Sequence, residues 1–215
     1  MVFKRISILT GHYGSGKTNL AVNFALDLAG QGKPVTLVDL DIVSPYFRSA
    51  DFRELLESRG VRVIAPHYAN TNLDIPALPA EIQSVFHQTD RMVILDVGGD
   101  DAGAIALGQF APQIRQEDYD LFYVVNERRY LTRDVESALE VLREIEACSR
   151  LKATALINNT NLGEETTPEL VVSSQGFAEE AAHKAGTPLA LTAAKRELAV
   201  PDAYPVEIYV RTAWA

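Results

Sequence analysis

The chain has 215 residues, of which 47% are hydrophobic, and its 29 acidic side chains outnumber its 20 basic ones to give a formal net charge of −9. This length and composition predict one globular domain over residues 1–215, and the negative charge disfavours nucleic-acid binding, which depends on Lys and Arg side chains that neutralise phosphates. The single cysteine, Cys148, excludes a disulfide framework and a cysteine-ligated iron–sulfur cluster, and it fits a cytoplasmic protein.

Short apolar runs alternate with helical patterns along the chain, which is typical of βαβ units in a mostly parallel sheet. Several of the runs are apolar throughout, as strands covered by helices on both faces are. The segments predicted as strands are 6–11, 34–41, 61–66, 92–99, 121–126, 153–159 and 188–192.

Three of the segments between these runs are predicted as helices. Residues 17–29 and 133–147 place apolar side chains on one face at a period of 3.6 residues. A third helix is expected to begin at Thr167-Pro168, an N-cap residue followed by a proline in the first turn, and to end at Gly186. The stretch 67–80 is one long irregular connection, and connections of that length are more often functional than idle.

No window of the sequence approaches the ~18 apolar residues that a membrane span requires. The C-terminal residues 206–215 alternate like a strand and do not form a basic amphipathic helix. We therefore expect no association with a membrane.

The first predicted strand runs into Gly-His-Tyr-Gly-Ser-Gly-Lys-Thr, residues 11–18, which matches the pattern G-x-x-x-x-G-K-[ST] in full. Its glycines let successive backbone N–H groups point at phosphate oxygens, and the dipole of the following helix adds positive potential. Lys17 is expected to reach the β- and γ-phosphates of a nucleotide, and the Thr18 hydroxyl to ligate Mg²⁺. The predicted nucleotide-binding residues here are Gly11, Gly14, Ser15, Gly16, Lys17, Thr18 and Asn19.

Carboxylates end two further predicted strands. Asp39 and Asp41 close the second, and Asp96 closes the fourth, three residues before Gly99. Ligands of open parallel sheets bind beyond the carboxyl ends of the strands, so these segments should lie beside the phosphate loop. There Asp96 would hold Mg²⁺, Gly99 would bring a backbone N–H to the γ-phosphate, and Asp41 would orient the attacking water. In isolation, a helix N-cap or a turn residue is the better interpretation of either aspartate, and the functional interpretation is favoured only together with the loop.

Together, the segments "GHYGSGKT", "VDLDIVSPYFR" and "VILDVGGDD" resemble the MinD/ParA/CobQ-type P-loop ATPases, relatives of the nitrogenase iron protein. The resemblance extends from residue 4 to about residue 192. It implies an α/β, three-layer P-loop NTPase fold with a mostly parallel sheet of about seven strands and helices on both faces. It also implies ATP and Mg²⁺ as cofactors, Lys17, Asp41 and Asp96 as catalytic residues, and Thr18, Asp41 and Asp96 as metal ligands.

The resemblance further implies that Asn158, in "LINNT", reads the nucleotide base. The alternative is that Asn158 only caps the end of its strand. A GTP-specific Asn-Lys-x-Asp pattern would need an aspartate where this chain has Asn161, which favours ATP.

One position departs from the family pattern. Many members carry a signature lysine at the second position of the loop, which reaches across a dimer to the partner's phosphates, and this chain has His12 there. Imidazole is shorter and mostly neutral at pH 7. Arg48, Arg128 or Arg129 could supply a positive group instead, although each could equally be a solvated surface residue.

The resemblance favours a nucleotide-driven switch that an unidentified protein partner reads, with a possible nucleotide-dependent homodimer. A second reading is an ATP-dependent small-molecule enzyme, either a ligase of the dethiobiotin synthetase kind or a kinase. Its substrate pocket could be lined by residues 44–50, 67–76 and 100–104. A third reading, a binding module without turnover, is disfavoured because all the expected catalytic positions except the signature lysine are filled.

Overall fold

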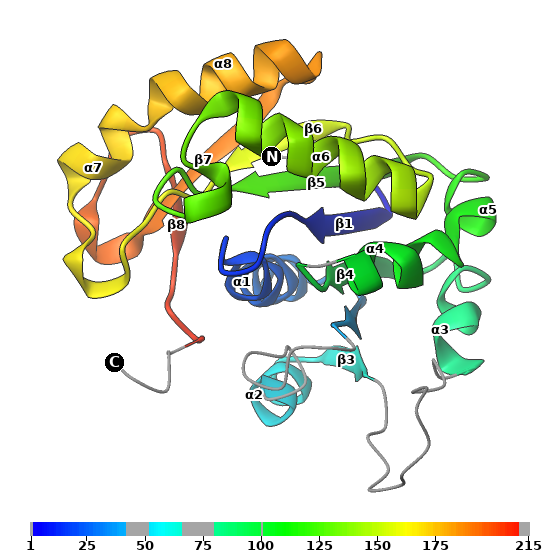
Figure 1. Cartoon of the computed structure of the whole chain (residues 1–215). Coiled ribbons are helices and arrows are strands. Elements are labelled where there is room, and N and C mark those ends of the chain that lie inside the picture. Colours follow the sequence, from blue (N-terminus) through cyan, green and yellow to red (C-terminus); the bar gives the residue numbers. More distant parts are fainter. Residues whose placement is uncertain (1, 42–51, 66–79, 100, 211–215) are drawn as a thin grey trace, which may run out of the picture.

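The computed structural model describes residues 2–41, 52–65, 80–99 and 101–210. In this part of the chain, eight parallel strands form one sheet in the order β3-β2-β4-β1-β5-β6-β7-β8 (Figure 1). The strands are β1 (Ile6–Thr10), β2 (Val35–Leu40), β3 (Val61–Ile64), β4 (Met92–Val97), β5 (Tyr119–Val125), β6 (Ala155–Asn158), β7 (Leu189–Lys195) and β8 (Tyr204–Val206).

Helices cover both faces of the sheet, and they are α1 (Lys17–Gly30), α2 (Arg53–Ser58), α3 (Ala80–Val85), α4 (Asp101–Gly108), α5 (Ala111–Ile114), α6 (Val135–Ser149), α7 (Pro168–Ser173) and α8 (Gln175–Ala185). Successive residues of β5 alternate between the faces. Phe122 and Val124 pack with Phe24 of α1, whereas Tyr123 and Val125 pack with α6 and α8. Figure 1 shows α1 and α2 on one side of the sheet and α4, α6 and α8 on the other. The predicted three-layer α/β fold is confirmed.

All seven predicted strands are present, and the sequence missed an eighth. Strand β8 has three residues and contains Pro205, so it is too short and too irregular to leave a periodic signal. The strand expected from the alternation of residues 206–215 begins with Val206 alone, because 207–210 are not in the sheet and 211–215 lie outside the described residues.

The helix predicted between Thr167 and Gly186 is divided into α7 and α8 at Ser174. The Thr167 side chain accepts a hydrogen bond from the backbone N–H of Leu170, so the predicted cap is present. The buried Ser174 hydroxyl donates to the carbonyl of Val171 and accepts from Asn158. A serine that bonds nearby backbone in this way competes with regular helix geometry, which explains the break.

Strand β1 lies in the middle of the sheet, between β4 and β5. The chain fills one side of β1 with β2, β3 and β4 and then crosses to β5 on the other side, so the strand order reverses at β1. Ligands of open α/β sheets bind at such a switch point, beyond the carboxyl ends of the strands. The loop at residues 11–16 lies there. None of the helices in the described residues is both long enough and apolar enough to cross a membrane.

Candidate nucleotide-binding site

Residues 11–16 turn from β1 into α1 around the carbonyl of His12. The backbone N–H of Ser15 donates to this carbonyl at 3.1 Å, and the ammonium group of Lys17 also donates to it at 3.1 Å. The side chain of Lys17 is buried, so its charge is held in a weakly screened environment. The start of α1 thus combines backbone N–H groups with a buried cation, the features of an anion site.

Asn159, which follows β6, fastens the loop from outside. Its carboxamide Nδ2 donates to the carbonyl of Ser15 at 2.7 Å, and a Cβ placed on Gly16 would lie 2.2 Å from the same nitrogen. Gly16 also has φ 87°, a conformation that favours glycine. Asn159 is a residue of the candidate site that the loop motif did not predict. The adjacent asparagines in "LINNT" were the available signal, but only the pairing of β5 with β6 brings this segment to the loop.

Asn158, the residue predicted to read the base, is fully buried in the last position of β6. Its Nδ2 donates to the hydroxyls of Ser174 at 2.9 Å and Thr192 at 3.5 Å, and its Oδ1 accepts from the backbone N–H of Thr160 at 3.1 Å. Its carboxamide is therefore engaged inside the fold. These are the contacts of a strand-end cap, the alternative that the sequence left open, and base reading by Asn158 stays a prediction.

Asn19 was predicted to bind the nucleotide, but its side chain holds the C-terminal segment. Its Nδ2 donates to the carbonyl of Glu207 at 3.0 Å, and its Oδ1 accepts from the N–H groups of Tyr209 and Val210 at 2.9 and 3.2 Å. Asn23, one turn further along α1, also bonds the backbone of Glu207. The Asn19 side chain thus has a structural role in this conformation.

The predicted carboxylates meet at the carboxyl edge of β2 and β4. Asp39 and Asp96 are directly opposite each other in the parallel ladder. Asp39 accepts a hydrogen bond of 2.9 Å from the backbone N–H of Asp41, which fixes the chain where β2 ends. All three side chains are buried, with 0%, 1% and 9% of Asp39, Asp96 and Asp41 exposed.

Burial, with the neighbouring Asp39 carboxylate as the second cause, raises the pKa of Asp96 to about 8. Lys17 and a hydrogen bond with Thr18 act in the opposite direction. The Oδ2 atom of Asp96 is buried and has no hydrogen-bond partner among the described residues. An acceptor left in this state indicates a place for a cation or a donor.

These residues fit a Mg²⁺ site. Mg²⁺ takes oxygen ligands, and it is commonly bound through one or two carboxylates together with substrate phosphates and water. Asp96 and the Thr18 hydroxyl supply oxygen ligands beside the phosphate loop. Among the described residues, no group of three His, Cys, Asp or Glu side chains could hold a metal by itself. The site therefore suits an ion whose coordination the phosphates complete.

Gly99 lies against the phosphate loop, as the sequence predicted. A Cβ on Gly99 would lie 2.5 Å from the backbone nitrogen of Tyr13 and 2.9 Å from the Lys17 ammonium. Only glycine allows this approach. Gly99, which lies between β4 and α4, is therefore in contact with the loop.

Of the four candidates for a positive group, His12 is part of the loop and Arg129 contacts it. Burial, followed by the charges of Lys17 and Arg129, lowers the pKa of His12 and keeps the imidazole neutral at pH 7. Arg129 donates to the carbonyl of Gly14, whereas Arg128 lies 3.8 Å from Glu127. Arg48 lies outside the described residues, as do 44–50, 67–76 and residue 100 of the predicted substrate pocket.

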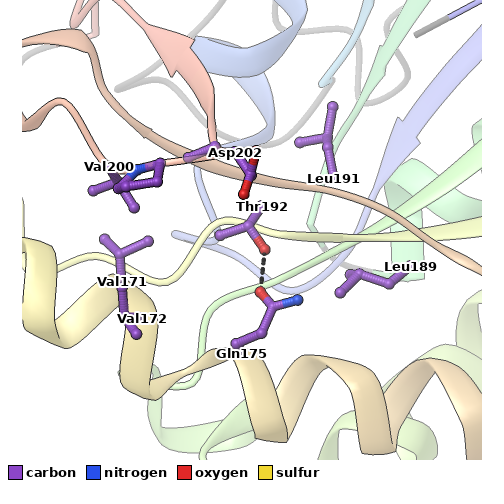
Figure 2. A pocket seen from close by; sticks show the side chains of 10 residues that line it. Val171, Val172, Gln175, Leu189, Leu191, Thr192, Val200 and Asp202 are labelled. Atoms are coloured by element: carbon purple, nitrogen blue, oxygen red, sulfur yellow. Dashed lines mark hydrogen bonds between the residues drawn. The ribbon is translucent and has the colours of Figure 1, made fainter.

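A separate cavity of about 400 Å³ lies between α7, α8, β7 and the segment before β8 (Figure 2). Figure 2 shows that its two central polar side chains point at each other, with the Thr192 hydroxyl donating to Gln175 at 2.7 Å. The other lining residues are mostly valine, leucine and alanine, and none is a cation. This cavity therefore lacks a cationic side chain of the kind that Lys17 supplies at the loop.

A family model described as the CobQ/CobB/MinD/ParA nucleotide binding domain matches residues 6–170. The chain belongs to this family. Its membership of the CobQ/CobB/MinD/ParA family confirms the resemblance carried by the phosphate loop and the aspartates. No curated protein matched the chain significantly.

Solved structures share the fold. Cell division protein FtsY of Thermotoga maritima is 18% identical with a TM-score of 0.59, over 94% of this chain and 65% of that one. The signal recognition particle 54 kDa protein of Aeropyrum pernix K1, in complex with GDP, is 19% identical with a TM-score of 0.61, over 93% and 43%. This CobQ/CobB/MinD/ParA family member thus spans less than two thirds of the length of either, and the likeness shows the P-loop fold alone.

Proposed function

We propose that this protein is a Mg²⁺-dependent ATPase that acts as a nucleotide-driven switch on a partner protein in the cytoplasm. The observation that carries the proposal is the unpartnered Oδ2 of Asp96, buried beside Thr18 and Lys17 at the phosphate loop. An ionised carboxylate buried at this place lowers the stability of the ligand-free protein, which is why its pKa is raised. A bound cation would stabilise the ionised form.

The chemistry would consist mainly of positioning and charge stabilisation, as in other phosphoryl transfers. The loop N–H groups and the Lys17 ammonium bind and orient the phosphates. Thr18 and Asp96 would hold Mg²⁺, which would neutralise charge on the phosphates. Asp41, whose backbone is fixed by Asp39, orients the attacking water from the end of β2.

The switch would act through the contact between Gly99 and the phosphate loop. Because Gly99 lies so close to Tyr13 and Lys17, a γ-phosphate at the loop would meet the β4–α4 connection directly. The conformation of this connection would then depend on which nucleotide is bound, and a partner protein would recognise that conformation. We propose residues 41–48, which follow β2, as a second segment that responds to the nucleotide. Beyond Asp41 this segment lies outside the described residues.

ATP is the proposed nucleotide because Asn161 stands in place of the aspartate of a GTP-specific pattern. Titration calorimetry with Mg-ATP, Mg-ADP and Mg-GTP tests this choice. We expect the tightest binding for Mg-ATP and none for Lys17→Ala, in which the loop cation is removed. Preferential binding of Mg-GTP would correct the nucleotide, and absence of binding by the wild-type protein would contradict the proposal.

The assembly state tests the switch. The Asp41→Ala variant is expected to block turnover. Light scattering would give its mass without nucleotide, with Mg-ADP and with Mg-ATP. A dimer that forms only with Mg-ATP would support a switch that dimerises. If the mass were the same with and without bound nucleotide, this dimer would be ruled out and the small-molecule ligase or kinase would be favoured. A screen of small-molecule substrates would then test that alternative.

A further inference from the structure

The segment that follows β5 lies against the phosphate loop through one arginine. The Nε atom of Arg129 donates to the carbonyl of Gly14 at 2.8 Å. A Cβ on Gly14 would lie 3.3 Å from Nε and 3.5 Å from Cζ of the same side chain. The guanidinium group of Arg129 therefore packs directly on the glycine-rich turn.

A buried asparagine sets the position of this arginine. The Oδ1 of Asn126 accepts from the N–H groups of Arg128 at 2.9 Å and Asn161 at 3.3 Å. Its backbone carbonyl accepts from the N–H of Arg129 at 3.1 Å and from the Thr132 hydroxyl at 2.7 Å. The turn that carries Arg129 is thus held by hydrogen bonds to both the side chain and the backbone of Asn126.

The two terminal nitrogens of Arg129 have no partner in the part of the chain that the structure describes. No hydrogen-bond acceptor or carboxylate of the described residues pairs with them, although the guanidinium group has five N–H donors in all. The neighbouring arginines differ, because Arg128 lies near Glu127, and Arg133 lies near Asp134 with its guanidinium over the Tyr130 ring. Arg129 is therefore the arginine of this segment that combines contact with the loop and unused donors.

We propose that Arg129 binds the nucleotide, with its terminal guanidinium nitrogens on a phosphate oxygen while Nε keeps its bond to Gly14. A planar fork of donors suits phosphate, and charge-assisted bonds of this kind are stronger than neutral ones. The proposal rests on the proposed nucleotide binding and names a residue beyond the loop motif. The electrostatic effect of Arg129 on His12 agrees with its place at the loop.

Arg129→Gln tests the proposal with little disturbance, because the glutamine Nε2 takes the place of the arginine Nε and can still donate to Gly14. The variant loses only the charge and the terminal donors. We expect Mg-ATP to bind roughly 10- to 100-fold more weakly, the loss of one charge-assisted contact, with an unchanged melting temperature. Arg129→Lys, which keeps the charge, should recover part of the affinity. Arg128→Gln is the matched control and should bind within about twofold of the wild type.

The salt dependence of Mg-ATP binding separates phosphate binding from loop support. Removing a cation that contacts phosphate should make affinity less sensitive to salt in Arg129→Gln, whereas loss of loop support alone would leave that sensitivity unchanged. Equal losses in the Arg128→Gln and Arg129→Gln variants, an unchanged salt dependence, or wild-type affinity in Arg129→Gln would each overturn the assignment. If the wild type bound neither Mg-ATP nor Mg-GTP, the proposed function itself would fail, and the assignment with it.

Discussion

The carboxamide of Asn159 donates a buried hydrogen bond to the carbonyl of Ser15, across 144 residues of sequence. This bond joins the end of β6 to the middle of the phosphate loop. Because a buried carbonyl left without its donor costs about 1–3 kcal/mol, the loop depends on a residue that no loop motif contains. The adjacent Asn158 faces the interior and bonds Ser174.

These two asparagines predict different consequences of substitution. Asn159→Ala should weaken nucleotide binding roughly tenfold, since about 1.4 kcal/mol of loop stabilisation corresponds to that factor. Asn158→Ala should mainly lower the free energy of unfolding, by about 1–3 kcal/mol, with little change in affinity. Calorimetry and urea unfolding of both variants would measure this. If Asn158→Ala instead bound the nucleotide more weakly but had the same free energy of unfolding as the wild type, Asn158 would be assigned to base reading.

The ionised form of Asp96, which a metal would need as its ligand, is expected to lower the stability of the metal-free protein. Its pKa is about 8 in the folded protein and about 3.9 in an unfolded chain. Between these values the folded state holds a proton that the unfolded state releases, so the free energy of unfolding falls as the pH rises. Asp96→Asn removes this dependence, and the variant should be more stable than the wild type by an amount that grows from about pH 4 to pH 8.

At pH 8 the gain should reach at least about 1 kcal/mol, because one unit of pKa shift corresponds to about 1.4 kcal/mol. Urea unfolding of the nucleotide-free protein would show it, with the exposed Asp101→Asn as the control. The same Asp96→Asn variant should lose the effect of Mg²⁺ on nucleotide binding. A variant that is equally stable at every pH, or that still responds fully to Mg²⁺, would contradict this picture of Asp96.

Asp41→Asn should lower the rate of phosphate release roughly 100-fold or more, the usual contribution of a group that positions or activates a nucleophile. Mg-ATP affinity should change little if Asp41 acts on water alone. Single-turnover assays over a range of Mg²⁺ concentrations would separate its two predicted roles. Recovery of the rate at high Mg²⁺ would identify Asp41 as a metal ligand. A rate that stays low at every Mg²⁺ concentration would indicate that Asp41 orients the attacking water.

Asn19→Ala should release the C-terminal segment from α1, since it removes three hydrogen bonds to residues 207–210. Hydrogen exchange of the Tyr209 and Val210 amides should accelerate, and the free energy of unfolding should fall by about 1–3 kcal/mol. Ile208→Ala, at an exposed position of the same segment, is the control. A large loss of nucleotide affinity in Asn19→Ala without faster hydrogen exchange would indicate that Asn19 binds the nucleotide.

The sequence by itself determined seven strands of the sheet, the phosphate loop and the position of the aspartates beside it. Apolar runs and helical periods are local patterns that follow from burial, and the loop motif is contiguous, so both are legible without a structure. Because β2 and β4 are parallel, their carboxyl ends had to meet at the edge where β1 ends, which placed Asp39, Asp41 and Asp96 together.

Only the tertiary structure decided which neighbouring polar side chains serve the loop. Asn158 and Asn159 are adjacent and chemically identical, yet one caps β6 and the other holds Ser15, because successive residues at a strand end point in different directions. Asn19 bonds a segment almost 190 residues away, and Arg129 reaches Gly14 across 115 residues. Such choices depend on how strands and loops distant in sequence pack together, and the local sequence carries no pattern for that packing.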